Sequence, residues 1–135
     1  MKIDGGCYCG KITFKAEVDP EQVRLCHCTD CQVMSGAPYR VNVPVAKDKI
    51  EFKGTTKSFL KTAESGNKRL QAFCPECGTS LYSCAEGDPQ SYTLRIGTIR
   101  QRAQLAPRTQ QWCRSALEWA DDLHDLPRFE KQRPG

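Results

Sequence analysis

Apolar and polar residues alternate with a period of two along much of this chain. In residues 11–18, KITFKAEV, every second side chain is apolar, and the others are charged or carry a hydroxyl group. This period places the apolar set on one face of a strand, so the segment is predicted to be a half-buried β-strand. Residues 39–45, YRVNVPV, repeat the pattern, but Pro44 cannot donate a backbone hydrogen bond and therefore favours an edge strand over a central one.

Five later segments also have the composition of short strands, and turn residues separate them. The predicted strands are residues 49–54, 57–64, 68–74, 80–86 and 91–99. The turn signals are Asp19-Pro20, Lys53-Gly54, Ser65-Gly66-Asn67 and Gly87-Asp88-Pro89. Because strands outnumber every other element, the sequence predicts a mostly β protein with antiparallel pairing.

Helical spacing occurs at only two places. Residues 115–123, SALEWADDL, begin with a serine that can cap a helix and carry apolar residues three apart, which predicts a short C-terminal helix. Residues 28–36, CTDCQVMSG, predict one helical turn. Gly36 is expected to close this turn, because glycine readily adopts the left-handed conformation that ends helices.

Length and charge narrow the classes of protein. A chain of 135 residues is most simply a single domain, 1–135, here with an ordered core over about residues 5–130 and a loose tail at 131–135. The net charge is only +4, and no run of basic residues is interleaved with aromatic ones. Nucleic acid is therefore a disfavoured partner, and small anionic ligands suit the charge at least as well. No apolar run resembles a membrane span or a signal peptide, so a cytoplasmic protein without a membrane partner is expected.

Nine cysteines form a pattern that favours metal binding over disulfide bonds. They occur as CYC at 7–9, CHCTDC at 26–31 and CPEC at 74–77, with Cys84 and Cys113 as single residues. Disulfides are rare in reducing compartments, and no export signal supports a secreted disulfide scaffold. An odd number of cysteines at CxC and CxxC spacings is typical of metal ligands instead. The two single cysteines are predicted to be ordinary or buried thiols.

The CPEC segment is the most specific local signal. Predicted strands flank it, and Gly78 favours a tight turn, so Cys74 and Cys77 are predicted to form a zinc knuckle. A redox CxxC motif would need a βαβ context, which the sequence lacks. Cys7 and Cys9 lie on one face of an extended segment between flexible glycines and provide a plausible second pair. A zinc ion bound by all four would tie the N-terminal strand to a distant hairpin, and such structural ions are worth roughly 10–16 kcal/mol.

Three further cysteines, Cys26, Cys28 and Cys31, remain as a separate set. Three protein ligands with an exchangeable fourth position are the arrangement of a catalytic zinc ion, which can hold a substrate thiol as thiolate. His27 stands between two of these cysteines and is expected to point away from the metal, at the surface or behind the ligands.

The same cysteines permit other interpretations. The set of three could share one closed site with Cys77 or Cys84, which would leave CYC as buried thiols and give one zinc ion per chain. The dense thiols could also form a redox switch, which predicts disulfides under mild oxidant with release of zinc. A third alternative is a non-catalytic, zinc-folded binding module for protein or nucleic acid.

The order of the motifs resembles one known family. GGCYCGKITF, CHCTDCQVMSGA, FCPECGTSLY, and a late tryptophan followed by LPRFE are similar to the glutathione-dependent formaldehyde-activating enzyme family, which also includes centromere protein V. The similarity extends from Gly5 to about Glu130. It implies a β-tent fold of antiparallel sheets organised around zinc, with two Zn²⁺ ions per chain.

By matching motif positions, the resemblance assigns one zinc ion to each cysteine set and makes the second ion catalytic. The structural ligands would be Cys7, Cys9, Cys74 and Cys77, and the catalytic zinc ligands would be Cys26, Cys28 and Cys31. The implied activity is that of a carbon–sulfur lyase: glutathione, or another thiol, and formaldehyde form S-(hydroxymethyl)glutathione or a similar adduct. Residues 106–113, APRTQQWC, lack a histidine that members of the family often carry, which leaves room for a thiol other than glutathione.

Several other side chains have possible roles near a substrate. Arginine side chains could bind the carboxylates of a peptide-like thiol. The arginines in question are Arg40, Arg69, Arg95 and Arg100, and most of them are expected to be exposed strand charges. Trp119 and Phe129 are expected to be anchors in the core or in a lid.

Overall fold

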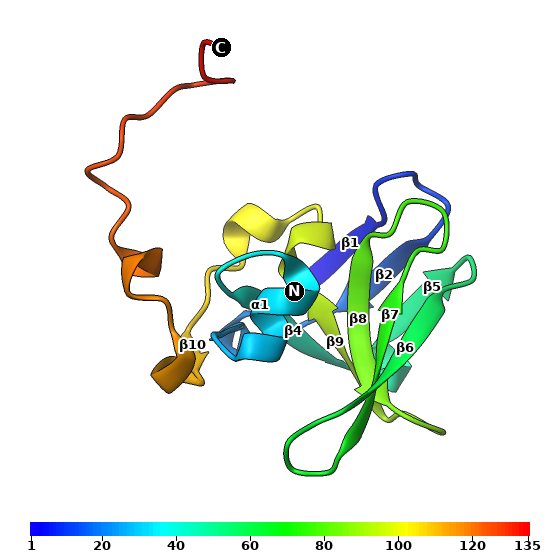
Figure 1. Ribbon diagram of the computed structural model, residues 1–135. Helices are drawn as coiled ribbons and strands as arrows, with labels where there is room; N and C mark the ends of the chain where they lie inside the picture. Colours follow the sequence, from blue (N-terminus) through cyan, green and yellow to red (C-terminus); the bar gives the residue numbers. More distant parts are fainter.

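Two β-sheets account for most of the regular structure in the computed structural model, which describes residues 1–135 (Figure 1). The smaller sheet has three antiparallel strands in the order β1-β2-β5. The larger sheet has seven strands in the order β10-β3-β4-β9-β8-β7-β6. Its neighbouring strands are antiparallel except for one pair, β10 and β3, which are parallel.

The strands are β1 (Lys2–Gly6), β2 (Thr13–Glu17), β3 (Arg24–Cys26), β4 (Arg40–Ala46), β5 (Ile50–Lys53), β6 (Lys57–Thr62), β7 (Lys68–Phe73), β8 (Ser80–Ala85), β9 (Ser91–Arg95) and β10 (Thr109–Gln111). The single α-helix is α1 (Thr29–Ser35), and the 3-10 helices are η1 (Pro20–Gln22), η2 (Lys47–Lys49), η3 (Ile96–Thr98), η4 (Arg102–Gln104), η5 (Cys113–Ser115) and η6 (Glu118–Asp121). No helix combines the length and the apolar surface needed to cross a membrane.

The hydrophobic core lies between the two sheets. Ile3 and Phe14 of the smaller sheet and Val43 and Leu94 of the larger sheet belong to one cluster of 15 buried residues. Aromatic rings join the two sides, because Phe52 on β5 contacts the rings of two tyrosines on β8 and β9. The structure therefore confirms the mostly β fold that the alternation predicted, with one set of side chains turned into this core.

All seven predicted strand segments contain a strand, but three strands were not predicted. β3 and β10 have three residues each. The sequence of β1, KIDGG, shows no clear alternation of apolar and polar residues. Short strands of this kind depend on their neighbours for their hydrogen bonds, so the local sequence carries little signal for them.

The expectation that Pro44 places its strand at an edge is wrong, because β4 lies between β3 and β9. The pairing with β3 ends at Asn42, however, whereas the pairing with β9 continues through Pro44. At the proline, β4 therefore has one strand neighbour, and proline is tolerated there as it is at a sheet edge.

The two helical predictions have different outcomes. The predicted turn within residues 28–36 is α1, and Gly36 ends it in the left-handed conformation with φ of 65°. The short C-terminal helix predicted at 115–123 is present only as the 3-10 helix η6. Trp119 is 56 % exposed and does not anchor the core, and Phe129 is also exposed. Ala120 is the one buried residue of η6, which leaves little apolar surface to stabilise an α-helix.

Candidate metal centres and the adjoining cavity

Four cysteines from two distant segments meet at one end of the sheets. Cys7 and Cys9 follow β1, and Cys74 and Cys77 follow β7. Their sulfur atoms all lie within 4.8 Å of one another, with 3.5 Å between Cys7 and Cys9 and 3.7 Å between Cys9 and Cys74. The structure thus brings together the set that the sequence analysis grouped, which we call the four-cysteine cluster.

The local backbone explains why these sulfur atoms converge. After β7 the chain turns back on itself, because the Gly78 N–H donates to the carbonyl of Cys74, and Gly78 has φ of 77°. A residue with a side chain would be strained at this angle. The Thr79 hydroxyl lies 3.2 Å from the Cys77 sulfur and lowers the pKa of that thiol to about 5. The Ile12 N–H donates to the Cys7 sulfur, so both segments stabilise thiolates.

The spacing of the four-cysteine cluster fits a tetrahedral zinc site. Zinc–sulfur bonds of about 2.3 Å give sulfur–sulfur edges of about 3.8 Å in a tetrahedron, which matches the distances above and is far longer than a disulfide bond. All nine cysteines are free thiols. Two of the four cluster members, Cys7 and Cys74, are buried and pack within the hydrophobic core. The cluster could therefore hold a metal ion that joins the first strand to the β7–β8 hairpin.

A second set of sulfur atoms lies at the start of α1, and we call it the three-cysteine cluster. Cys26 ends β3, Cys28 is the N-cap of α1, and Cys31 lies in its first turn. Their sulfur atoms also lie within 4.8 Å of one another. Cys77 belongs to the other cluster and the buried Cys84 belongs to neither, so the structure does not assemble the closed four-ligand alternative.

The three-cysteine cluster favours thiolates. The Cys31 N–H donates to the sulfur of Cys28, at 3.3 Å. A hydrogen bond from Cys31 lowers the pKa of the Cys26 thiol to about 4, and the same contact raises the pKa of Cys31 above its ordinary value. At neutral pH at least one sulfur atom of the set is therefore a thiolate, which is the form that binds metals.

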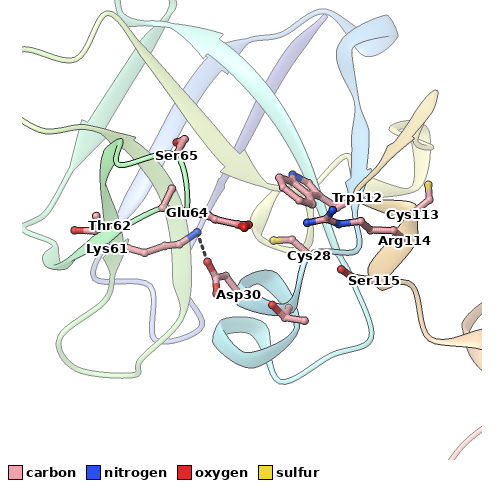
Figure 2. A pocket seen from close by; sticks show the side chains of 12 residues that line it. Cys28, Asp30, Lys61, Thr62, Glu64, Ser65, Trp112, Cys113, Arg114 and Ser115 are labelled. Atoms are coloured by element: carbon pink, nitrogen blue, oxygen red, sulfur yellow. Dashed lines mark ion pairs between the residues drawn. The ribbon is translucent and has the colours of Figure 1, made fainter.

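A cavity of about 430 Å³ opens beside the three-cysteine cluster. It continues into an outer groove of about 1030 Å³, and the two share Cys28, Asp30, Lys61 and Trp112. Figure 2 shows the groove, with Lys61 of β6 reaching Asp30 on α1 through an ion pair of 2.8 Å. On the other side Trp112 lies near Cys28, with the guanidinium of Arg114 at 5.2 Å from its ring centroid. The cluster is therefore accessible from a partly enclosed space.

The polar face of the larger sheet forms the floor of this cavity. Five polar side chains that alternate with core residues along β4, β7, β8 and β9 are buried: Arg40, Asn42, Gln71, Ser83 and Arg95. The expectation of exposed strand charges is therefore wrong for Arg40 and Arg95. It holds for Arg100, whose side chain is 74 % exposed and pairs with Asp4. The alternation in the sequence distinguishes the two faces of a strand. It could not predict that the polar face of the larger sheet is also covered, by α1 among other elements.

Two placements were expected for His27, at the surface or behind the cysteines, and the structure excludes the first. It is 5 % exposed, its Nε2 atom lies 2.7 Å from the side-chain oxygen of Gln110, and its ring contacts Tyr39 edge to face. It thus lies behind the three-cysteine cluster, where its backbone N–H donates to the carbonyl of Gln111 on β10, and it is absent from both sulfur clusters. Tyr8, the residue between the other pair, is 95 % exposed and points away from its cluster as expected.

Strand β10 contributes residues to the site that the sequence analysis did not nominate. Gln111 pairs with Cys26 in the parallel ladder, and its side chain is one of the groups that lower the pKa of that thiol. Trp112 follows with φ of 56°, a left-handed conformation that is uncommon for a bulky residue and turns its ring toward the groove. The family resemblance drew attention to residues 106–113, but the local sequence did not predict this placement, because it depends on pairing across more than 80 residues.

Known proteins resemble this chain in sequence and in fold. The family model described as glutathione-dependent formaldehyde-activating enzyme matches residues 2–115. An uncharacterized lyase of Schizosaccharomyces pombe is 27 % identical over 85 residues, which cover 58 % of this chain and 55 % of that protein. The chain thus spans about half the length of this curated relative. A crystal structure of a Rhodobacter sphaeroides protein superposes with a TM-score of 0.59 at 16 % identity, over 79 % of this chain and 98 % of that one, which shows a shared fold.

Proposed function

Because the chain belongs to the glutathione-dependent formaldehyde-activating enzyme family, we propose that it joins a thiol to an aldehyde. The substrates are glutathione, or a similar thiol, and formaldehyde, and the product is S-(hydroxymethyl)glutathione or its analogue. Formally this is a carbon–sulfur lyase reaction in the direction of synthesis. The observation that carries the proposal is the three-cysteine cluster, whose sulfur atoms gather beside a cavity large enough for a small molecule.

In this proposal the two cysteine clusters have separate roles, with one zinc ion in each. The four-cysteine cluster, Cys7, Cys9, Cys74 and Cys77, is a closed structural site, because four thiolates complete a tetrahedron. The three-cysteine cluster, Cys26, Cys28 and Cys31, leaves one position for a substrate thiol. When bound there, zinc supplies a charge that favours the thiolate form of the substrate.

The residues around the cluster contribute positioning and exclusion of water. The substrate sulfur forms a bond to the aldehyde carbon, and the carbonyl oxygen takes up the proton that the thiol releases. Trp112 lies on one side of the groove and Lys61 on the other, so a thiol bound between them has few orientations. Holding two reactants in this way lowers the entropic cost of a bimolecular addition.

The test is to remove one ligand of the three-cysteine cluster. In Cys28→Ser, zinc content should fall from two ions per chain to one, and the acceleration of adduct formation should be lost while the fold is retained. Zinc is measured by elemental analysis, and adduct formation by exchange NMR with ¹³C-formaldehyde and glutathione. Cys84→Ala is the matched control, because Cys84 is a buried cysteine outside both clusters.

Two outcomes would contradict the proposal. Unchanged turnover in Cys28→Ser after complete loss of the second zinc ion would exclude a catalytic role for the cluster. A wild-type protein that contains both ions but does not accelerate the addition of any thiol to formaldehyde would favour a binding module instead.

A further inference from the structure

Two arginines are buried in the floor of the cavity without an acidic partner. Arg40 on β4 is 8 % exposed and Arg95 on β9 is 6 % exposed, yet none of the ion pairs in the structure includes either of them. The only carboxylate that lines the cavity is Asp30, which pairs with Lys61. Burial of a positive charge is costly, and besides Asp30 only the thiolates of the three-cysteine cluster offset it within this cavity. An anionic ligand that enters the cavity would lower this cost further.

Neutral amides hold the two guanidinium groups in place. The side-chain oxygen of Gln71 accepts from Arg95 Nη2 at 2.7 Å and from Arg40 Nη1 at 3.4 Å, and the side-chain oxygen of Asn42 accepts from Arg95 Nη1 at 2.8 Å. These bonds fix the orientation of the guanidinium groups without neutralising them. Arg40 Nη2 and Arg95 Nε are buried and have no hydrogen-bond partner. The arrangement is therefore a preorganised set of donors for an anion.

The position of this pair relates it to the proposed reaction. Arg40 lies directly opposite Cys26 in the antiparallel ladder between β3 and β4, and both side chains line the same cavity. Side chains opposite each other in such a pair start from β-carbons about 5 Å apart. A ligand with its sulfur at the three-cysteine cluster would therefore place groups a few bonds away against the arginines.

We propose that Arg40 and Arg95 bind a carboxylate of the thiol substrate, so that the protein selects acidic thiols over neutral ones. A carboxylate matches the fork of a guanidinium with two parallel hydrogen bonds, which a hydroxyl or an amide cannot do. The inference rests on the proposed function, because that proposal identifies the substrate as a thiol. It adds that Arg40 and Arg95 determine which thiols the cavity beside the three-cysteine cluster accepts. A competing explanation is that the arginines only balance the charge of the neighbouring thiolates.

The experiment measures binding without reaction. S-methylglutathione, which has no free thiol, and its dimethyl ester are titrated by calorimetry into the zinc-loaded protein. We expect the wild type to bind the free acid at least about tenfold more tightly than the ester, because each charge-assisted hydrogen bond contributes appreciably to affinity. Arg40→Gln should weaken binding of the acid to the level of the ester and leave the ester unaffected. Arg100→Gln removes the same charge from the other side of the molecule and should change neither affinity.

Two results would overturn the inference, and a third would separate it from the proposed function. Equal affinity for acid and ester in the wild type, or no binding of the acid, excludes a carboxylate site and does not depend on whether any variant folds. If Arg40→Gln lowers zinc content but leaves the acid-to-ester ratio unchanged, the arginines serve only to balance the thiolates. A wild type that prefers the acid but does not accelerate adduct formation would contradict the proposed function and leave the carboxylate site standing.

Discussion

The two cysteine clusters use the same kind of ligand in opposite surroundings. The four-cysteine cluster includes two buried residues that pack in the hydrophobic core, Cys7 and Cys74, and it joins segments almost 70 residues apart. The three-cysteine cluster takes its sulfur atoms from six consecutive residues and lies beside a polar cavity lined by arginines. We therefore expect the first cluster to stabilise the tertiary structure, and we expect changes in the second to have less effect on folding.

The largest expected effect is on stability, from a change in the four-cysteine cluster. In Cys74→Ser the loss of a ligand in the core should lower the melting temperature by more than about 15 °C, because structural zinc contributes several kcal/mol. Circular dichroism during heating measures this effect. Cys84→Ala controls for the loss of a buried cysteine outside the clusters, and a shift in Cys74→Ser no larger than in this control would contradict a structural role.

The same kind of substitution in the other cluster should have a different result. Cys31→Ser should abolish binding of one zinc ion and all catalysed adduct formation, but lower the melting temperature by less than about 5 °C. The reason is that Cys31, unlike Cys74, is not a member of the hydrophobic core. If the two substitutions destabilise the protein equally, the contrast between the clusters is wrong.

The rate at which zinc is removed should differ between the two clusters. A chelator should extract the metal in two steps, first from the accessible three-cysteine cluster and later from the four-cysteine cluster, whose release requires the core to open. A coloured zinc indicator follows the release, and circular dichroism should change only in the second step. Thiol counting after each step also tests for a redox switch, because that alternative requires disulfides among Cys26, Cys28 and Cys31. A single step with simultaneous unfolding would contradict the expected order.

The smallest expected effects come from two glycines, one beside each cluster. Gly78 and Gly36 have φ of 77° and 65°, and no atom lies within 4 Å of the position of an added β-carbon. Alanine at either position should therefore cost about 1 kcal/mol of unfolding free energy from backbone strain alone. Urea denaturation measures this cost. Gly78→Ala should also speed release of the second-step zinc, whereas Gly36→Ala should affect only the first step; the reverse pattern would contradict the assignment.

The sequence predicted the elements whose signals are local. Alternation identifies the strands that face the core, as in 11–18, and the spacing of CPEC with its following glycine predicts the knuckle because a few adjacent residues determine both. The burial of Arg40 and Arg95 could not be predicted, since it depends on which elements cover the second face of the larger sheet. The place of Gln111 and Trp112 depends likewise on a parallel pairing between distant segments. The roles of the seven cysteines stay predictions until metal content is measured.

One feature of the larger sheet bears on how such proteins could diversify. The three residues of β10 are exposed and are attached along the outer edge of β3, while the core is complete without them. Substitutions at Gln111 and Trp112 would reshape one wall of the cavity without replacing any of the clustered cysteines or any residue of the hydrophobic core. We therefore expect this short segment to be the part of the chain where new substrate preferences can arise at the least risk to folding.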